Sequence, residues 1–218
     1  MRRELEHFII DGSYGWNQDW FPDFFMRMGG CAAVTACDAC VYFALRMGHE
    51  NLIPFSPEHI TRANYLILSR HMKRVLGPRM RGVDKLEIYQ DGLGAYFQEV
   101  HENQISIGAW HGEKSYLSAQ ERLIAQINAG LPVPFLLLQH ADPAFDFYTW
   151  HWFLLMGYHT PDRSDNPDNP DASDSSGNPD AFQVQAVTYG HRSWLNFQAL
   201  WNTGFDEKGG MILFHLVK

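Results

Sequence analysis

The sequence has only three cysteines among its 218 residues, and it has no excess of positive charge. An odd and low cysteine count argues against a disulfide scaffold and is typical of a reducing compartment, so we expect a cytoplasmic protein. Seventeen lysines and arginines against 25 aspartates and glutamates leave a formal net charge of −8. A nucleic-acid surface needs a basic patch, so nucleic acid is not an expected partner.

Long apolar runs are also missing. No segment reaches the roughly 20 apolar residues that a membrane helix needs, so we expect no membrane partner. No apolar run follows the basic pair Arg2-Arg3, so we expect no signal peptide. The chain is nevertheless 45% hydrophobic, with 15 Phe, 9 Tyr and 7 Trp. Such a chain can bury a large core, and we interpret residues 1–218 as a single domain.

The hydrophobic pattern predicts helices in the first part of the chain and strands in the second. We expect helices over 31–47, 56–76, 85–100 and 118–129, and strands over 104–110, 134–138, 151–158, 182–189 and 211–217. Gly48 should end the first helix, Ser56-Pro57-Glu58 should open the second, and a capping box at Ser118 should open the fourth. The strand over 182–189 alternates in polarity, as a strand with one solvated face does. This order predicts an α+β fold with an antiparallel sheet.

Residues 159–181 are rich in Asp, Asn, Pro and Ser. They offer little to bury, so we expect a mobile loop that forms an expanded hairpin connection. Aspartates recur there at every third position from Asp162 to Asp174, which raises the possibility of calcium binding. The segment lacks the glycine hinge and the bidentate glutamate of an EF-hand loop, so a solvated loop is the preferred interpretation.

Cys31 follows the pair Gly29-Gly30 and opens the predicted helix 31–47. Unpaired N–H groups and the helix dipole at that end favour a thiolate, which is the nucleophilic form, and they can stabilise an oxyanion. The glycines allow a close backbone approach beside the thiol. The alternative is that Cys31 is simply a small buried residue.

A metal site is the second alternative, because Cys37 and Cys40 have CxxC spacing. On one straight helix Cys31 and Cys40 lie about 180° apart, so the three sulfurs cannot converge on one ion. No second CxxC or matching histidine pair follows. We therefore interpret Cys37 and Cys40 as small core residues and expect no metal or cofactor.

His151 lies between two tryptophans in a predicted strand and is the preferred partner for the thiol. A packed histidine with a structural hydrogen bond is the alternative. Among the other histidines, His140 and His191 flank predicted strands and remain competitors.

In order, these features resemble those of a known family. The features are, in order, Gln18, the Cys31 helix, Gly130-Leu131-Pro132-Val133-Pro134-Phe135, and a strand from His151 to Gly157-Tyr158. This arrangement is similar to that of the papain-like cysteine peptidases, and it is closest to the bacterial double-glycine leader peptidase branch. The resemblance covers about residues 17–215, and each motif in it is short. It implies a papain-like fold in which the nucleophile helix packs against the sheet, acting on a peptide or another acyl substrate through a thioester.

By this resemblance Cys31 is the nucleophile, His151 is the general base and acid, and Gln18 supplies an N–H to the oxyanion hole. Two features depart from the family. Gln18 lies thirteen residues before the cysteine, which predicts an extra loop over 20–28 that bulges out. The Asn or Asp that orients the histidine is replaced by Thr188, which we expect to accept from His151 Nδ1–H and leave Nε2 for the thiol.

The alternative is that Thr188 has no orienting role and is simply a strand residue, favoured there by its β-propensity. Three functions therefore stay open: a cysteine peptidase, an acyltransferase or amidase on the same fold, and a papain-like binding domain that has lost activity. The intact set of Gln18, Cys31 and His151 favours the first two, and the missing Asn or Asp favours the third. The substrate and the oligomeric state do not follow from the sequence.

Overall fold

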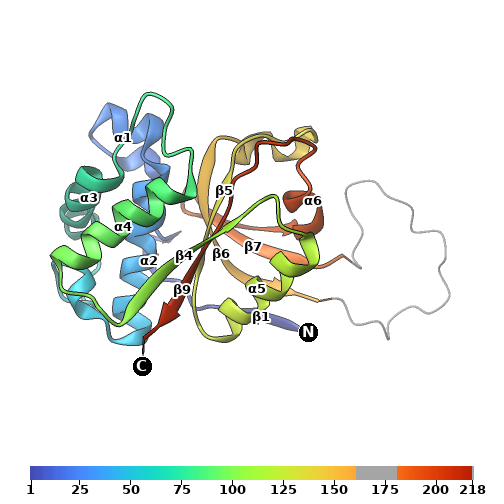
Figure 1. Ribbon diagram of the computed structural model, residues 1–218. Helices are drawn as coiled ribbons and strands as arrows, with labels where there is room; N and C mark the ends of the chain where they lie inside the picture. Colours follow the sequence, from blue (N-terminus) through green and yellow to red (C-terminus); the bar gives the residue numbers. More distant parts are fainter. Residues whose placement is uncertain (161–180, 218) are drawn as a thin grey trace, which may run out of the picture.

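The computed structural model describes residues 1–160 and 181–217. Its elements form two halves that lie side by side (Figure 1). The helical half contains α1 (Phe24–Gly29), α2 (Cys31–Met47), α3 (Arg62–Leu76) and α4 (Leu86–Glu99), with the 3-10 helices η1 (Gln18–Trp20) and η2 (Glu50–Leu52). The other half contains most of the sheet together with α5 (Tyr116–Asn128), α6 (Phe197–Trp201) and the 3-10 helix η3 (Pro143–Tyr148).

The main sheet is antiparallel and has the strand order β4-β9-β5-β6-β7-β8, with β1 also paired to β6. Its strands are β1 (Arg2–Glu4), β4 (Ile105–His111), β5 (Val133–Leu137), β6 (His151–His159), β7 (Gln183–Thr188), β8 (His191–Asn196) and β9 (Gly210–Leu216). A separate pair joins β2 (Ile9–Ile10) to β3 (Ser13–Tyr14). The fold class is α+β with an antiparallel sheet, as the order of predicted elements indicates.

Helix α2 has the bounds that the sequence predicts. Gly48 ends it in the left-handed conformation, with φ of 78°, and donates its N–H to the carbonyl of Phe43. The helix packs against α3 and against β6, so nearly all of its surface is buried. Its many Ala and Cys side chains suit this position because small residues let neighbouring elements approach. Cys37 and Cys40 are fully buried, which confirms them as core residues.

Two predicted helix starts are wrong. Helix α3 begins at Arg62 rather than at residue 56, because the Thr61 hydroxyl accepts from the N–H of Asn64 and caps the helix there. Helix α5 begins at Tyr116, and its cap is Ser115, which accepts from the N–H of Ser118. Ser118 thus lies inside the first turn. In both cases a second Ser or Thr close to the expected cap fits the helix end better.

The other predicted elements agree with the structure to within a residue or two. The sequence did not predict β1, β2, β3, β8, α1, α6 or the three 3-10 helices. The prediction of a solvated face on 182–189 is wrong for β7, whose residues 184–187 are all buried. Burial of Gln185 is tolerated because its amide donates a hydrogen bond to the carboxylate of Glu4 in β1. The predicted loop over 159–181, with its aspartates, lies almost entirely outside the described residues; His159 belongs to β6.

Candidate functional site

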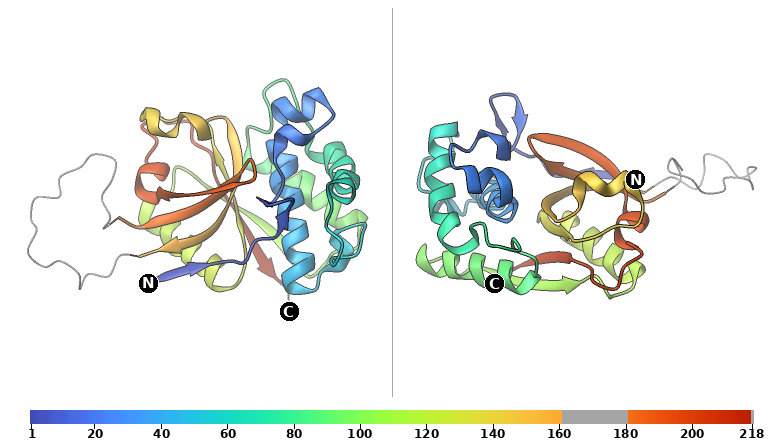
Figure 2. Two further views of the ribbon diagram at one scale, coloured as in Figure 1. Left: turned by 180° about the vertical axis from the view of Figure 1, so that it is seen from behind. Right: turned by 90° about the horizontal axis from the view of Figure 1, so that it is seen from above.

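A cavity of about 660 Å³ lies between the two halves and brings together three of the four predicted site residues. Cys31, His151 and Gln18 all line it. The helical half adds Phe25, Met28, Gly29 and residues 78–84, and the sheet half adds Leu136, Leu138, Phe147, Thr149, Trp150, Trp152 and Tyr189. Thr188 does not line the cavity, but it contacts His151 from behind. The view from above shows the two halves that supply these walls (Figure 2).

The backbone around Gly30 places Cys31 at the first position of α2. Gly30 donates its N–H to the carbonyl of Met26 at 2.9 Å and thereby ends α1, while its own carbonyl accepts from the N–H of Val34 in α2. A Cβ at Gly30 would lie 2.5 Å from the Met26 oxygen, which is too close for any other residue. The close backbone approach at this glycine pair is therefore the one between Gly30 and the Met26 carbonyl.

The Cys31 sulfur is faced by backbone N–H groups from both halves. The N–H groups of Trp152 in β6 and of Ala32 in α2 hydrogen-bond the sulfur and favour its thiolate form. Burial opposes them and is the larger effect, so the pKa of the Cys31 thiol is raised above its usual value. The expectation that the helix start favours a thiolate is wrong for this resting state, because desolvation outweighs the N–H groups.

His151 is the first residue of β6, where it pairs in register with Leu137 of β5. Its Nε2 atom lies 2.7 Å from the Thr188 hydroxyl and shares a hydrogen bond with it. The predicted contact exists, but it uses Nε2 and not Nδ1, so the ring is turned the other way. Within the described residues Nδ1 makes no hydrogen bond, so it is the ring nitrogen that remains open to another partner.

Burial also controls the protonation of His151. The side chain is 6% exposed, and desolvation lowers its pKa to about 4. At neutral pH the imidazole is therefore uncharged and can accept a proton. With the pKa of Cys31 raised and that of His151 lowered, the resting pair is a neutral thiol and a neutral imidazole.

Gln18 reaches the cavity from η1, and its amide is partly occupied. Its Nε2 donates to the carbonyl of Arg27 in α1 at 2.8 Å, which is the only hydrogen bond of this side chain within the described part. One N–H of the same nitrogen remains for a ligand. The contact explains how a glutamine thirteen residues before Cys31 is returned to the site.

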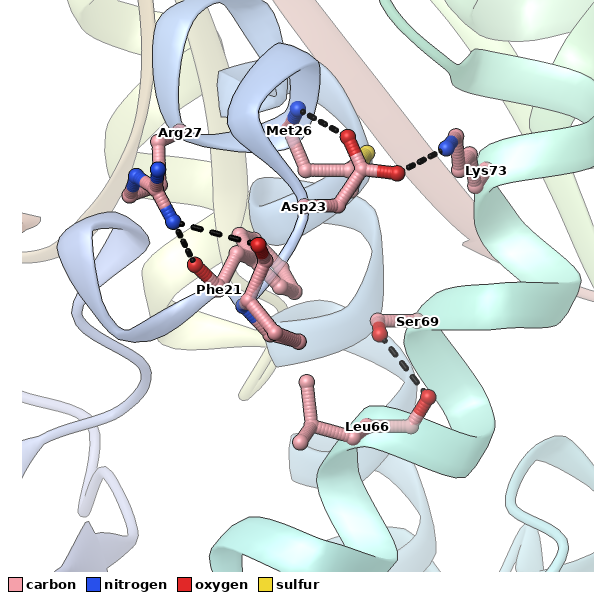
Figure 3. Close-up of polar contacts among 8 residues, drawn as sticks. Phe21, Asp23, Met26, Arg27, Leu66, Ser69 and Lys73 are labelled. Carbon is pink, nitrogen blue, oxygen red and sulfur yellow. Dashed lines mark hydrogen bonds and ion pairs between the residues drawn. The ribbon is translucent and has the colours of Figure 1, made fainter.

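The predicted bulging loop over 20–28 is instead largely helical and firmly held (Figure 3). Asp23 caps α1 by accepting from the N–H of Met26, and its other oxygen binds Lys73 of α3. The Arg27 guanidinium donates to the carbonyl of Phe21 at 2.6 Å. These contacts fix α1, and with it the acceptor that holds Gln18.

Two aromatic residues next to the histidine have strained backbones. Trp150 precedes His151 with φ of 51°, and Tyr189 follows Thr188 with φ of 49°. Bulky residues rarely adopt this left-handed region, and such strain is common at functional sites. The Tyr189 ring stacks on the His151 ring, with centroids 5.1 Å apart and planes 13° from parallel. Neither residue was identified from the sequence, although Tyr189-Gly190 occupies the turn positions after the predicted strand.

The competing histidines lie outside the site. His140 contacts the carbonyl of Ala199 through Nε2 and accepts from the N–H of Asp142 through Nδ1. His191 is an exposed residue of β8, opposite Thr188 in the sheet. Neither lines the cavity that contains Cys31.

Over residues 1–160 and 181–217, no group of three or more His, Cys, Asp or Glu side chains is arranged to hold a metal ion. In the same part of the chain no helix is long and apolar enough to cross a lipid bilayer. Comparison with protein-family models, curated proteins and solved structures gives no match to this chain.

Proposed function

We propose that this protein is a cysteine hydrolase of the papain-like type, a peptidase that acts through a thioester on Cys31 with His151 as general base and acid. The observation that carries the proposal is the shared cavity, in which a thiol at a helix start is hydrogen-bonded by the N–H of the residue that follows His151. The proposed nucleophile, base and orienting group then come from α2, β6 and β7 respectively, and the reaction requires the first two to come within hydrogen-bond reach of each other.

In the proposed reaction, His151 Nδ1 takes the proton of the Cys31 thiol as the sulfur attacks the substrate carbonyl carbon. The new C–S bond creates an oxyanion, which the backbone N–H of Cys31 and the amide of Gln18 stabilise. The imidazolium then gives its proton to the leaving amine as the C–N bond breaks. Water, deprotonated by His151, hydrolyses the thioester and restores the thiol.

A neutral thiol and a neutral imidazole in the resting state suit this series of reaction steps. An uncharged imidazole is ready to accept the proton at neutral pH, because its pKa is lowered to about 4. The thiolate is formed only when the substrate carbonyl is present to be attacked. The Thr188 hydroxyl, by sharing a hydrogen bond with Nε2, holds the ring so that Nδ1 is available.

Alkylation by iodoacetamide at pH 7, followed by mass mapping, tests the proposed pair. Cys31 should be labelled first, because it is partly exposed while Cys37 and Cys40 are fully buried. Exposure alone would give that order, so the decisive variant is His151→Ala, which should slow labelling of Cys31 by about tenfold or more as the base is lost. The matched control is His191→Ala, an exposed histidine outside the cavity, which should leave the rate unchanged.

Labelling that is equally fast in His151→Ala and in the unchanged protein contradicts the proposal. So does preferential labelling of Cys37 or Cys40. The thioester itself is detected by intact-protein mass after a brief reaction with an activated peptide ester, and Cys31→Ala should abolish that adduct. If the adduct resolves onto an added amine in preference to water, the protein is an acyltransferase that uses the same two residues.

A further inference from the structure

A group of exposed apolar side chains lies around one cavity of this protein. Thirteen large apolar residues are exposed in the described part of the chain, and five of them line the cavity that holds Cys31. These five are Phe25 (68% exposed), Met28 (71%), Met80 (fully exposed), Phe147 (60%) and Trp150 (50%). Clustered exposed apolar groups beside a cavity mark a binding surface, whereas single scattered ones need no explanation.

The five residues come from two facing walls. Phe25 and Met28 lie on α1 and Met80 lies in the segment between α3 and α4, so all three belong to the helical half. Phe147 on η3 and Trp150 before β6 belong to the sheet half. A substrate bound at Cys31 would therefore have apolar surface on both of its sides.

Each wall is tied to the site. The Trp152 indole donates to the carbonyl of Val83 at 2.6 Å, which joins the Met80 segment to the strand that carries His151. On the other wall, the Phe147 ring contacts the Tyr189 ring that stacks on His151. The Met80 segment and Phe147 are thus each linked to a residue that lies next to His151.

The polar groups of the same cavity favour a peptide over an alkyl chain. Arg79, Arg81 and Asp84 interrupt the apolar lining, and Gln18 and Thr149 add further polar groups. A peptide alternates apolar side chains with a polar backbone and fits such a lining, while a fatty acyl chain needs continuous apolar walls. The volume of about 660 Å³ lies within the roughly 300–1,000 Å³ of ligand sites.

We propose that the substrate is a peptide with bulky apolar side chains next to the scissile bond, held between the wall of Phe25, Met28 and Met80 and the wall of Phe147 and Trp150. This inference rests on the proposed function of Cys31 and His151. Glycines at these substrate positions would leave both walls uncovered.

Two peptidyl chloromethyl ketones that differ only in the residues before the reactive group test this inference. The Leu-Phe probe should alkylate Cys31 at least tenfold faster than the Gly-Gly probe, measured by intact-protein mass. Met80→Ser and Phe147→Ser, one on each wall, should each reduce that advantage severalfold. The matched control is Leu117→Ser on α5, an equally exposed apolar residue (67%) that does not line the cavity.

Equal rates for the two probes, or an advantage that survives both wall substitutions, overturns the inference. A fatty acyl thioester that modifies Cys31 faster than either peptide overturns it as well. So does a dimer in sedimentation velocity that Met80→Ser dissociates, since a second copy would then cover the walls. If iodoacetamide labelling still depends on His151 in these cases, the proposed hydrolase stands and only its substrate is wrong.

Discussion

The two halves of the molecule build their parts of the site in different ways. The helical half places Cys31 through local contacts: α1 ends at Gly30, α2 begins at once, and the whole junction spans a few residues. The sheet half places His151 through long-range pairing, because the ring is held by Thr188, 37 residues further along the chain. Local geometry is therefore critical on one side and strand register on the other.

The halves agree in their effect on charge. Burial raises the pKa of the Cys31 thiol on the helical side, and it lowers the pKa of the His151 imidazole on the sheet side. Both shifts favour the neutral form. A permanent ion pair would need at least one of the two pKa shifts to be reversed, so in the proposed reaction charge would develop only as the thiol attacks.

The substitution with the largest expected effect tests the local geometry of the helical half. Gly30→Ala would place a Cβ 2.5 Å from the Met26 carbonyl oxygen, and the backbone must move to relieve this contact. We expect a loss of about 2–3 kcal/mol in the free energy of unfolding, measured with urea. The matched control is Gly94→Ala in α4, where no atom lies within 4 Å of the new Cβ, and which should be neutral or slightly stabilising.

If the two alanine variants are equally stable, the junction between α1 and α2 is not as tight as its geometry indicates. Loss of stability only in Gly30→Ala, with slower alkylation of Cys31, would show that the same contact also positions the thiol.

The next largest effect is a pH dependence of stability, which tests the burial of His151 in the sheet half. The pKa of His151 is about 4 in the folded protein and near 6.5 in the unfolded chain, so the unfolded state binds more protons between these values. Stability from the neutral ring is complete above pH 6.5 and is lost as the pH falls toward 4. The part due to His151 should amount to about 2 kcal/mol between pH 7 and pH 5.

Urea unfolding at pH 7 and pH 5 measures this difference, and His151→Gln separates it from the other titrating groups. The variant should lose less stability over the interval than the unchanged protein does. An identical pH dependence in both proteins would mean that His151 is not held neutral by burial.

A substitution with a smaller expected effect tests the strand register that brings Thr188 to His151. Thr188→Val keeps the shape of the side chain but removes the hydroxyl that lies 2.7 Å from Nε2. We expect turnover to fall about tenfold, typical of a lost orienting hydrogen bond worth about 1 kcal/mol or more. Thr188→Ser retains the hydroxyl and should recover most of the rate. Unchanged turnover in Thr188→Val would reduce the site to a dyad of Cys31 and His151.

The same contrast explains what the sequence could predict. Helix α2 and its end at Gly48 follow from local periodicity and turn chemistry, and so does the position of Cys31. The strand with His151 is an apolar run, and it too was found. The α+β class follows from the order of such elements, which needs no knowledge of tertiary contacts.

Features that depend on tertiary packing could not be predicted from local sequence patterns. Which imidazole nitrogen contacts Thr188 depends on the rotation of the ring in the packed sheet. The raised pKa of Cys31 depends on how deeply the folded chain buries the thiol, and a helix start alone predicts the opposite direction. The return of Gln18 to the site depends on α1, which has too few residues to show a helical period.

The smallest expected effect concerns Tyr189, where strain and stacking oppose each other. Its φ of 49°, followed by 75° at Gly190, is the backbone of a tight hairpin turn that favours Asn at the first position. Tyr189→Asn relieves strain worth about 1 kcal/mol but loses stacking worth roughly as much. We therefore expect little change in stability, within about 1 kcal/mol. Because the ring covers His151, the pKa of that histidine should rise from about 4 toward its ordinary value, and turnover should fall.

Proton NMR titration of His151 measures this change in pKa without any substrate. Tyr189→Phe keeps both the ring and the strained turn, so it should leave the pKa and the turnover unchanged, which makes it the matched control. A His151 pKa that stays near 4 in Tyr189→Asn would show that the sheet alone desolvates the ring. The strained tyrosine would then have no role in the proton transfer, and the reason for its conformation would have to be sought in the apolar wall that it shares with Phe147.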